Sequence, residues 1–247
     1  MENTGQLYAY DSDRMRLRPI FERLKRAGVR NAQVLDPGNA EALAELEGKM
    51  DRVIVDAPCT GSGVWRRRPD AKWRLSPQML EARLAEQRAV LDQAARLVKP
   101  GGRLAYITCS VLPPENRRPG RRLHRSFPEF GIVPWPELWE QAAFSAAPPQ
   151  SADGSAETLL MTPRGFGTDG FCVVLSAHEP RASTVGRATP GQKTCDATPL
   201  PLEINKRVAE MTRAFDGRMR IGDWRRGPSA NAGGDVSSPM NLLLGEA

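Results

Sequence analysis

Two cysteines fifty residues apart are the side chains of this sequence best placed for chemistry. Cys59 follows the apolar run at 53–55 and opens a turn of Thr, Gly and Ser, while Cys109 follows the run at 104–107 and precedes Ser110. Short β-branched or aromatic runs that end in turn residues are typical of buried parallel strands. The carboxyl ends of such strands form the ligand-binding edge of an open α/β sheet, so we expect both thiols in one crevice.

An unpaired cysteine is more often a small buried hydrophobe than a nucleophile. Cys172, within an apolar run at 171–175, fits that role, and Cys195 lies among Gly, Pro, Thr and Lys with no interpretable pattern. Cys59 and Cys109 differ because polar turn residues follow each of them. Four cysteines in 247 residues without a secretory leader indicate a reducing compartment rather than a disulfide framework. There is no CxxC pair or His-rich cluster, so we expect no metal site.

The net charge of +6 and the isoelectric point of about 9.4 favour an acidic partner, above all a nucleic acid. Basic residues cluster directly after the first cysteine motif, where two tryptophans lie among them. Lys and Arg can bind phosphates, and aromatic faces can stack on bases, so we predict an RNA-binding segment. The alternative is a solvated basic loop. The candidate RNA-binding residues are Arg66, Arg67, Arg68, Lys72 and Arg74, with Trp65 and Trp73 interleaved.

No stretch of the sequence reaches the roughly eighteen apolar residues of a membrane-spanning helix. The first residues are polar and of mixed charge, unlike a signal peptide. We therefore expect a cytoplasmic protein with no membrane partner. The sequence does not indicate its oligomeric state.

Strand and helix patterns alternate over the first half of the chain, which predicts a mostly parallel α/β sheet. Ser76 and Pro77 open the longest predicted helix, as a cap and a first-turn residue. A helix is also expected at 117–125, although Pro119 and Gly120 should interrupt it. The strands are predicted at 7–10, 32–35, 52–56, 103–108, 132–133 and 171–175, and the other helices at 13–27 and 40–47. Residues 180–247 are expected to be mostly disordered, with one possible helix at 202–215.

Four motifs occur in a fixed order: Asp-Ala-Pro-Cys at 56–59, Arg-Pro-Asp-Ala-Lys-Trp at 68–73, Lys-Pro-Gly-Gly at 99–102, and Thr-Cys-Ser-Val-Leu-Pro followed by Glu-Asn at 108–116. Together they resemble the NOL/NOP/Sun (RsmB-like) family of RNA cytosine-5 methyltransferases, over about residues 5–176. The resemblance implies the class I methyltransferase fold, a Rossmann-like α/β sheet. It also implies S-adenosylmethionine as methyl donor and an RNA substrate, either rRNA or tRNA.

The roles of the two cysteines follow from this resemblance. Cytosine C5 is too weak a nucleophile to take a methyl group directly, but a thiolate that adds at C6 makes C5 enamine-like. Cys109 matches the family's nucleophile, which must ionise, and a basic, partly exposed pocket would favour the thiolate. Cys59 matches the second cysteine, which assists breakdown of the covalent adduct after methylation.

Three aspartates match cofactor-binding positions of the same family. Asp11 matches the acid that hydrogen-bonds the cofactor ribose, Asp36 the acid near the adenine, and Asp56 a residue that lines the cofactor and cytosine pocket. Each could instead be a helix cap or a turn former. This alternative is strongest for Asp36, which precedes Pro and Gly.

The resemblance also predicts a defect. The family opens its sheet with a strand and a glycine-rich loop, whereas this sequence begins at the segment that matches the second strand. We therefore expect an incomplete catalytic domain at 1–179, with a gap between the strands that end at Asp11 and Asp56. Weak binding of S-adenosylmethionine and low stability would follow.

Three rival functions differ in their chemistry. An inactive remnant could retain RNA binding. A thiol redox protein is disfavoured because the sequence has no nearby cysteine pair. An adenine methyltransferase is disfavoured because methylation of an amino group needs no cysteine nucleophile.

Overall fold

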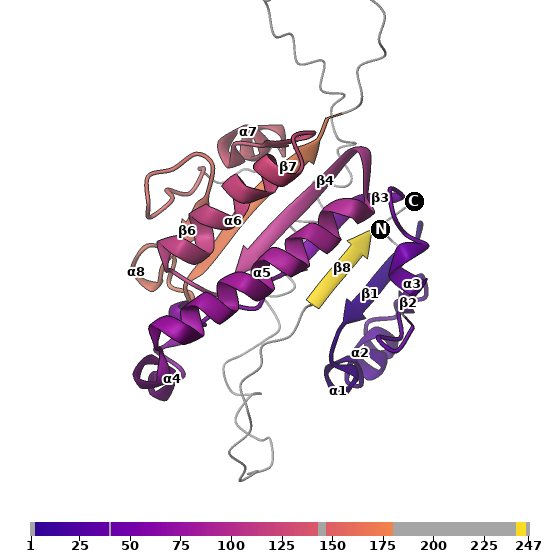
Figure 1. Cartoon of the computed structure of the whole chain (residues 1–247), viewed down its shortest axis with the longest axis horizontal. Helices are drawn as coiled ribbons and strands as arrows, with labels where there is room; N and C mark the ends of the chain where they lie inside the picture. Colours follow the sequence, from indigo (N-terminus) through magenta and orange to yellow (C-terminus); the bar gives the residue numbers. More distant parts are fainter. Residues whose placement is uncertain (1–2, 40, 143–146, 180–240, 246–247) are drawn as a thin grey trace, which may run out of the picture.

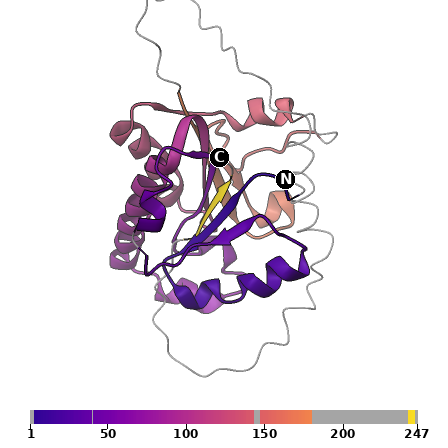
Figure 2. The same cartoon turned by 90° about the vertical axis from the view of Figure 1, so that its right-hand side faces the viewer.

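The computed structural model describes residues 3–39, 41–142, 147–179 and 241–245. These residues form a mixed sheet with helices packed against it (Figures 1 and 2). The strands are β1 (Leu7–Asp11), β2 (Ala32–Val34), β3 (Met50–Asp56), β4 (Val98–Thr108), β5 (Phe130–Ile132), β6 (Leu159–Met161), β7 (Phe171–His178) and β8 (Asn241–Gly245). Their order in the sheet is β2-β1-β8-β3-β4-β7-β5, with β6 paired to β7. The predicted α/β sheet is therefore present, but the expectation that it is mostly parallel is wrong. Among the described strands only β1–β2 and β3–β4 pair in parallel, and β8, β7, β5 and β6 pair antiparallel to their neighbours.

The two longest helices lie side by side over one face of this sheet (Figure 1). They are α5 (Pro77–Leu97) and α6 (Pro113–Ser126). The Ser76 hydroxyl accepts a hydrogen bond from the Met79 amide at 3.2 Å, which confirms the predicted cap of α5. The remaining helices are α1 (Arg14–Leu17), α2 (Ile20–Arg26), α3 (Glu41–Ala44), α4 (Pro69–Arg74), α7 (Trp135–Gln141) and α8 (Pro163–Phe166), with a 3-10 turn η1 at Ser62–Val64.

The centre of the sheet is closed, so the expected gap is wrong. Strand β8 lies between β1 and β3 and pairs antiparallel with both, with Asn241 opposite Asp11 on one side and Asp56 on the other. The inner edges of β1 and β3 thus have backbone partners. Strand β8 belongs to the segment 180–247 that was expected to be mostly disordered. The rest of that segment, with the helix expected at 202–215, lies outside the described residues.

Helix α6 continues through Pro119, contrary to the expected interruption. Proline has no N–H to donate to the carbonyl four residues earlier, which here belongs to Glu115. The buried Tyr106 hydroxyl on β4 donates to that carbonyl at 2.9 Å instead. A side chain from the sheet therefore replaces the missing helical hydrogen bond. The helix expected at 13–27 does divide, into α1 and α2, at Pro19.

The hydrophobic core lies between α5 and the central parallel strands. Val53 and Val55 on β3 and Leu104 on β4 are almost fully buried, as are Ala94 and Leu97 on α5. These contacts fix the carboxyl ends of β3 and β4 next to each other, where the two cysteine motifs begin.

Candidate active site at the carboxyl ends of β3 and β4

The two predicted catalytic cysteines meet at this edge. Strands β3 and β4 are parallel neighbours, with Asp56 paired to Ile107, so the loops that follow them start side by side. The Sγ atoms of Cys59 and Cys109 are 3.3 Å apart. The expectation that both thiols occupy one crevice is confirmed.

A thiol redox protein was disfavoured because no two cysteines are close in the sequence. The short Sγ–Sγ distance corrects this point, since Cys59 and Cys109 are neighbours in space. The separation of 3.3 Å is far longer than a disulfide bond of about 2.05 Å. Cys59, Cys109 and Cys172 are all free thiols. Cys172 is buried in the core, as its apolar surroundings in the sequence predicted.

The two thiols are not equivalent. Cys59 is buried, and its pKa is raised, first by its hydrogen bond to Cys109 and then by its burial. Cys109 is only half-buried, and the hydrogen bond from Cys59 lowers its pKa. These directions favour Cys59 as the S–H donor of the pair and the thiolate on Cys109.

Glu115, in the first turn of α6, joins the two cysteine loops. Its side chain is fully buried and accepts four hydrogen bonds. Oε1 accepts from the Thr60 amide at 2.9 Å and from Gln87 Nε2 at 3.0 Å. Oε2 accepts from the Thr60 hydroxyl at 2.6 Å and from the Ser110 hydroxyl. Because Thr60 follows Cys59 and Ser110 follows Cys109, this one carboxyl group ties both loops together.

Further hydrogen bonds hold the same loops. The Ser62 hydroxyl lies 2.9 Å from that of Ser110, and the Gly63 amide donates to the Cys109 carbonyl at 2.9 Å. The Gly170 amide donates to the Gly63 carbonyl at 2.9 Å, and a Cβ on Gly63 would lie 2.1 Å from the Gly170 oxygen. Only glycine fits at position 63, because backbone presses against it from two sides.

Asn116 adds a second anchor from α6. Its amide nitrogen donates to the Ser110 carbonyl at 3.0 Å, and its oxygen accepts from the Thr108 hydroxyl at 2.8 Å. Sequence reasoning treated Glu115 and Asn116 only as part of a motif and gave them no role. The available signal was their position: an acid and an amide that open a helix directly after a strand-tip cysteine.

The three candidate cofactor aspartates differ in their surroundings. Asp11 is 1% exposed, and burial raises its pKa. Its Oδ1 accepts from the Asp13 amide at 2.8 Å, while Oδ2 has no hydrogen-bond partner among the described residues. Asp56 is exposed at the end of β3. A buried acceptor without a partner fits a hydroxyl donor from a ligand, such as a ribose.

Asp36 is engaged within the protein. Both of its oxygens accept from Arg14, at 2.6 and 2.7 Å, and Oδ1 also accepts from the Gly38 amide at 2.9 Å. The hydrogen bond from Arg14 lowers the pKa of this exposed carboxyl group. The geometry matches the turn-forming alternative, and the predicted contact with an adenine stays a prediction.

The predicted RNA-binding segment is exposed, but part of its charge is paired internally. Arg67 contacts Asp169 at 2.6 Å, and Arg66 lies 3.8 Å from the same carboxyl group. Arg74 pairs with Asp70 in α4 at 2.7 Å. The segment also holds Arg68, and it holds Lys72, whose Nζ lies 5.5 Å from the centre of the Trp73 ring.

Trp73 is 82% exposed and offers an open aromatic face beside these cations. A flat exposed ring next to Lys and Arg is the arrangement that stacks on unpaired bases. Among the described residues, no group of three His, Cys, Asp or Glu side chains could hold a metal ion, and no helix is long and apolar enough to cross a membrane.

A model of the 16S rRNA methyltransferase RsmB/F family matches residues 1–173. The chain belongs to this family. It is 40% identical over 119 residues to ribosomal RNA small subunit methyltransferase B of Shewanella oneidensis, an alignment that covers 47% of this chain and 27% of that protein. The corresponding protein of Salmonella paratyphi B is 40% identical over 113 residues, which are 46% of this chain and 26% of the relative. The matched part is thus about a quarter of each relative.

Solved structures related to the RsmB/F family share this fold. The crystal structure of PH0851 matches with a TM-score of 0.58 and 36% identity, over 71% of this chain and 38% of that one. NSun6 from Pyrococcus horikoshii, solved with SFG, matches with a TM-score of 0.59 and 28% identity, over 72% of this chain and 42% of that one. The resemblance and the class I methyltransferase fold predicted from the motifs are therefore confirmed.

Proposed function

We propose that this chain is the catalytic part of an RNA cytosine-5 methyltransferase that acts on ribosomal RNA. Cys109 is its nucleophile, and Cys59 assists release of the product. The observation that carries the proposal is the contact of the two thiols at 3.3 Å, with the charge favoured on the more exposed one. We assign residues 1–179, together with β8, to the catalytic domain.

Cys109 begins the reaction as a thiolate. Its sulfur forms a bond to C6 of cytosine, and the electron pair of the C5–C6 double bond becomes available at C5. S-adenosylmethionine would supply the methyl group to C5 as an electrophilic sulfonium and leave as a neutral thioether. The proton on C5 must then depart before the bond between C6 and sulfur breaks, which restores the double bond and the Cys109 thiolate.

Cys59 is suited to this second half of the reaction. While Cys109 is a free thiolate, it accepts the Cys59 S–H, and this hydrogen bond is the main cause of the raised pKa of Cys59. Once the Cys109 sulfur is bonded to carbon, that cause is removed. Cys59 can then ionise more readily and accept a proton during elimination. Glu115 keeps both loops in place throughout.

The cofactor proposal is supported by Asp11 and by the relatives. NSun6 was solved with SFG, an analogue of S-adenosylmethionine. The unpartnered Oδ2 of Asp11 would accept from the ribose, and Asp56 would line the pocket. The closed sheet removes one of the two grounds for expecting weak binding. The other ground, that no segment of this sequence was matched to the family's glycine-rich loop, stays.

The decisive experiment is methyl transfer from radiolabelled S-adenosylmethionine to 16S rRNA. Cys109→Ala should abolish the incorporation. Cys59→Ala should instead accumulate a protein–RNA adduct that survives denaturing gel electrophoresis. An adduct with Cys109→Ala would mean that the two roles are reversed.

The inactive remnant that binds RNA is the competing function. It predicts RNA binding by the wild type with no heat of binding on calorimetric titration with S-adenosylmethionine. Tight cofactor binding by the wild type would exclude it.

A further inference from the structure

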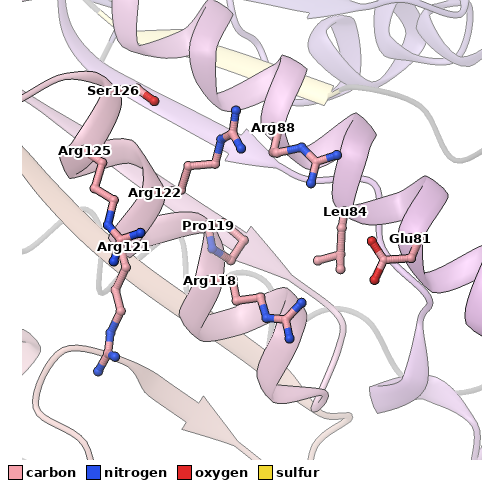
Figure 3. Close-up of a pocket in the computed structure, with 9 residues that line it drawn as sticks. All are labelled: Glu81, Leu84, Arg88, Arg118, Pro119, Arg121, Arg122, Arg125 and Ser126. Atoms are coloured by element: carbon pink, nitrogen blue, oxygen red, sulfur yellow. The ribbon is translucent and has the colours of Figure 1, made fainter.

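A strongly basic groove lies between α5 and α6, and neither of the two catalytic cysteine candidates lines it. Its volume is about 570 Å³, within the range of ligand pockets. Arg118, Arg121, Arg122 and Arg125 project from α6, and Arg88 projects from α5 (Figure 3). One acid, Glu81, lines the same groove.

The four arginines of α6 form a single row. Positions 118, 121, 122 and 125 have the spacing that places side chains on one face of a helix. Like charges three or four residues apart repel each other, so the row has an unfavourable energy by itself. None of the five groove guanidinium groups makes an ion pair or hydrogen bond with the described part of the chain. Arg117, which does not line the groove, is different: its guanidinium group forms an ion pair with the Asp153 carboxylate at 3.5 Å.

The row is too long for one small anion. From Arg118 to Arg125 the helix rises about 10 Å, at roughly 1.5 Å per residue. A polymer with repeated negative charges neutralises several of these arginines together. The planar guanidinium group suits phosphate oxygens, to which it can donate two parallel hydrogen bonds.

The apolar side chains of the groove offer no anchor for a protein. Leu84 and Pro119 line it, but both are buried. Protein interfaces depend on apolar or aromatic anchors in a desolvated centre, which this groove lacks. The observations favour a nucleic acid over an acidic peptide.

We propose that this groove binds the phosphodiester backbone of the RNA substrate, as a second contact surface besides the segment at 66–74. This inference rests on the proposed function, since it assumes an RNA partner. Helix α6 starts four residues after Cys109, and α5 starts three residues after α4. The groove is therefore built from the two helices that adjoin the thiols and the basic segment in the chain, and these helices lie side by side (Figure 1). RNA bound at the thiols would extend along them.

The test compares two variants of equal charge change. The groove variant carries Arg118→Gln, Arg121→Gln, Arg122→Gln and Arg125→Gln. The control carries Arg18→Gln, Arg23→Gln, Lys25→Gln and Arg26→Gln, at and near α2, where these side chains make no ion pair with the described residues. Binding of a fluorescein-labelled 16S rRNA fragment is followed by fluorescence anisotropy over a series of KCl concentrations, after circular dichroism has confirmed the fold of each variant.

We expect the groove variant to bind at least tenfold more weakly at 0.1 M KCl. Its log–log salt slope should fall by about 1.4 or more, since each lost phosphate contact contributes about 0.7 for a single strand. The control should keep the slope within about 0.5. Arg88→Gln alone, which leaves α6 intact, should lower the slope by a smaller amount in the same direction.

The outcomes distinguish a failure of the groove proposal from a failure of the proposed function. A wild type that binds RNA, with a groove variant of unchanged slope, would overturn the groove alone. Equal losses in both variants would overturn it too, because only net charge would then matter. A wild type that binds no RNA would overturn the proposed function with it. Competition by a polyglutamate peptide as strong as by unlabelled RNA would assign the groove to an acidic protein.

Discussion

Glu115 offers the sharpest test of how this site is held together. Glu115→Ala removes the acceptor of two buried N–H groups, the Thr60 amide and one of the two Gln87 Nε2 hydrogens. The other Gln87 hydrogen keeps its bond to the Pro58 carbonyl at 2.9 Å. The Ser110 hydroxyl can rotate towards the Ser62 oxygen, 2.9 Å away, and the half-buried Thr60 hydroxyl can turn towards water. Each buried donor left unsatisfied costs about 1–3 kcal/mol, so we expect a loss of about 2–6 kcal/mol in the free energy of unfolding.

Glu115→Gln separates charge from shape. The amide oxygen can replace Oε1, and the amide nitrogen can donate to the two hydroxyls that Oε2 accepted from. The hydrogen bonds lose their charge assistance, so we expect a loss of about 1–2 kcal/mol. Both variants should be compared by urea unfolding, followed by circular dichroism.

Glu137→Ala is the matched control, because Glu137 also lies in the first turn of a helix but is exposed. It removes the interaction with the helix dipole, worth roughly 0.3–1 kcal/mol, without touching a buried network. Equal urea midpoints for Glu115→Ala and the wild type would refute the reasoning. Equal losses for Glu115→Ala and Glu137→Ala would show that the helix dipole alone matters.

Two further predictions concern the sheet and the thiols. Leu243→Pro removes a backbone donor from β8, so amide hydrogen exchange should accelerate in both β1 and β3. Unchanged protection of these amides would mean that β8 does not stabilise the two strands. Cys59→Ala removes the S–H donor that lowers the pKa of Cys109, so the pH midpoint for alkylation of Cys109, read by peptide mass spectrometry, should rise. Cys59→Ser keeps a donor and should shift the midpoint less, and a midpoint that falls in Cys59→Ala would contradict the assigned direction of the hydrogen bond.

The cysteine pair was predictable because it depends on local patterns. Each cysteine directly follows an apolar run, and parallel strands bring such positions to one edge. The exposed basic segment was predictable for the same reason. The internal pairing of Arg66 and Arg67 was not, since their partner Asp169 is about a hundred residues away in the sequence.

The role of Glu115 was out of reach because four donors from three separate segments converge on it. Its motif position was visible, but the burial of its carboxyl group was not. The continuity of α6 was missed for a similar reason. The rule that proline interrupts a helix is local, while the hydroxyl that compensates for Pro119 comes from Tyr106 on β4.

Strand β8 has a consequence for the order in which the molecule can form. Among the described strands, β1 and β2 join the rest of the sheet only through β8. Their partner β8 is synthesised more than a hundred residues after β4, so β3, β4 and α5 can assemble first while the edge of β1 is still unpaired. Contacts between such distant segments slow folding, because a very long loop must close before they form. The thiols can therefore come together on the ribosome well before β8 fixes Asp11 in the sheet.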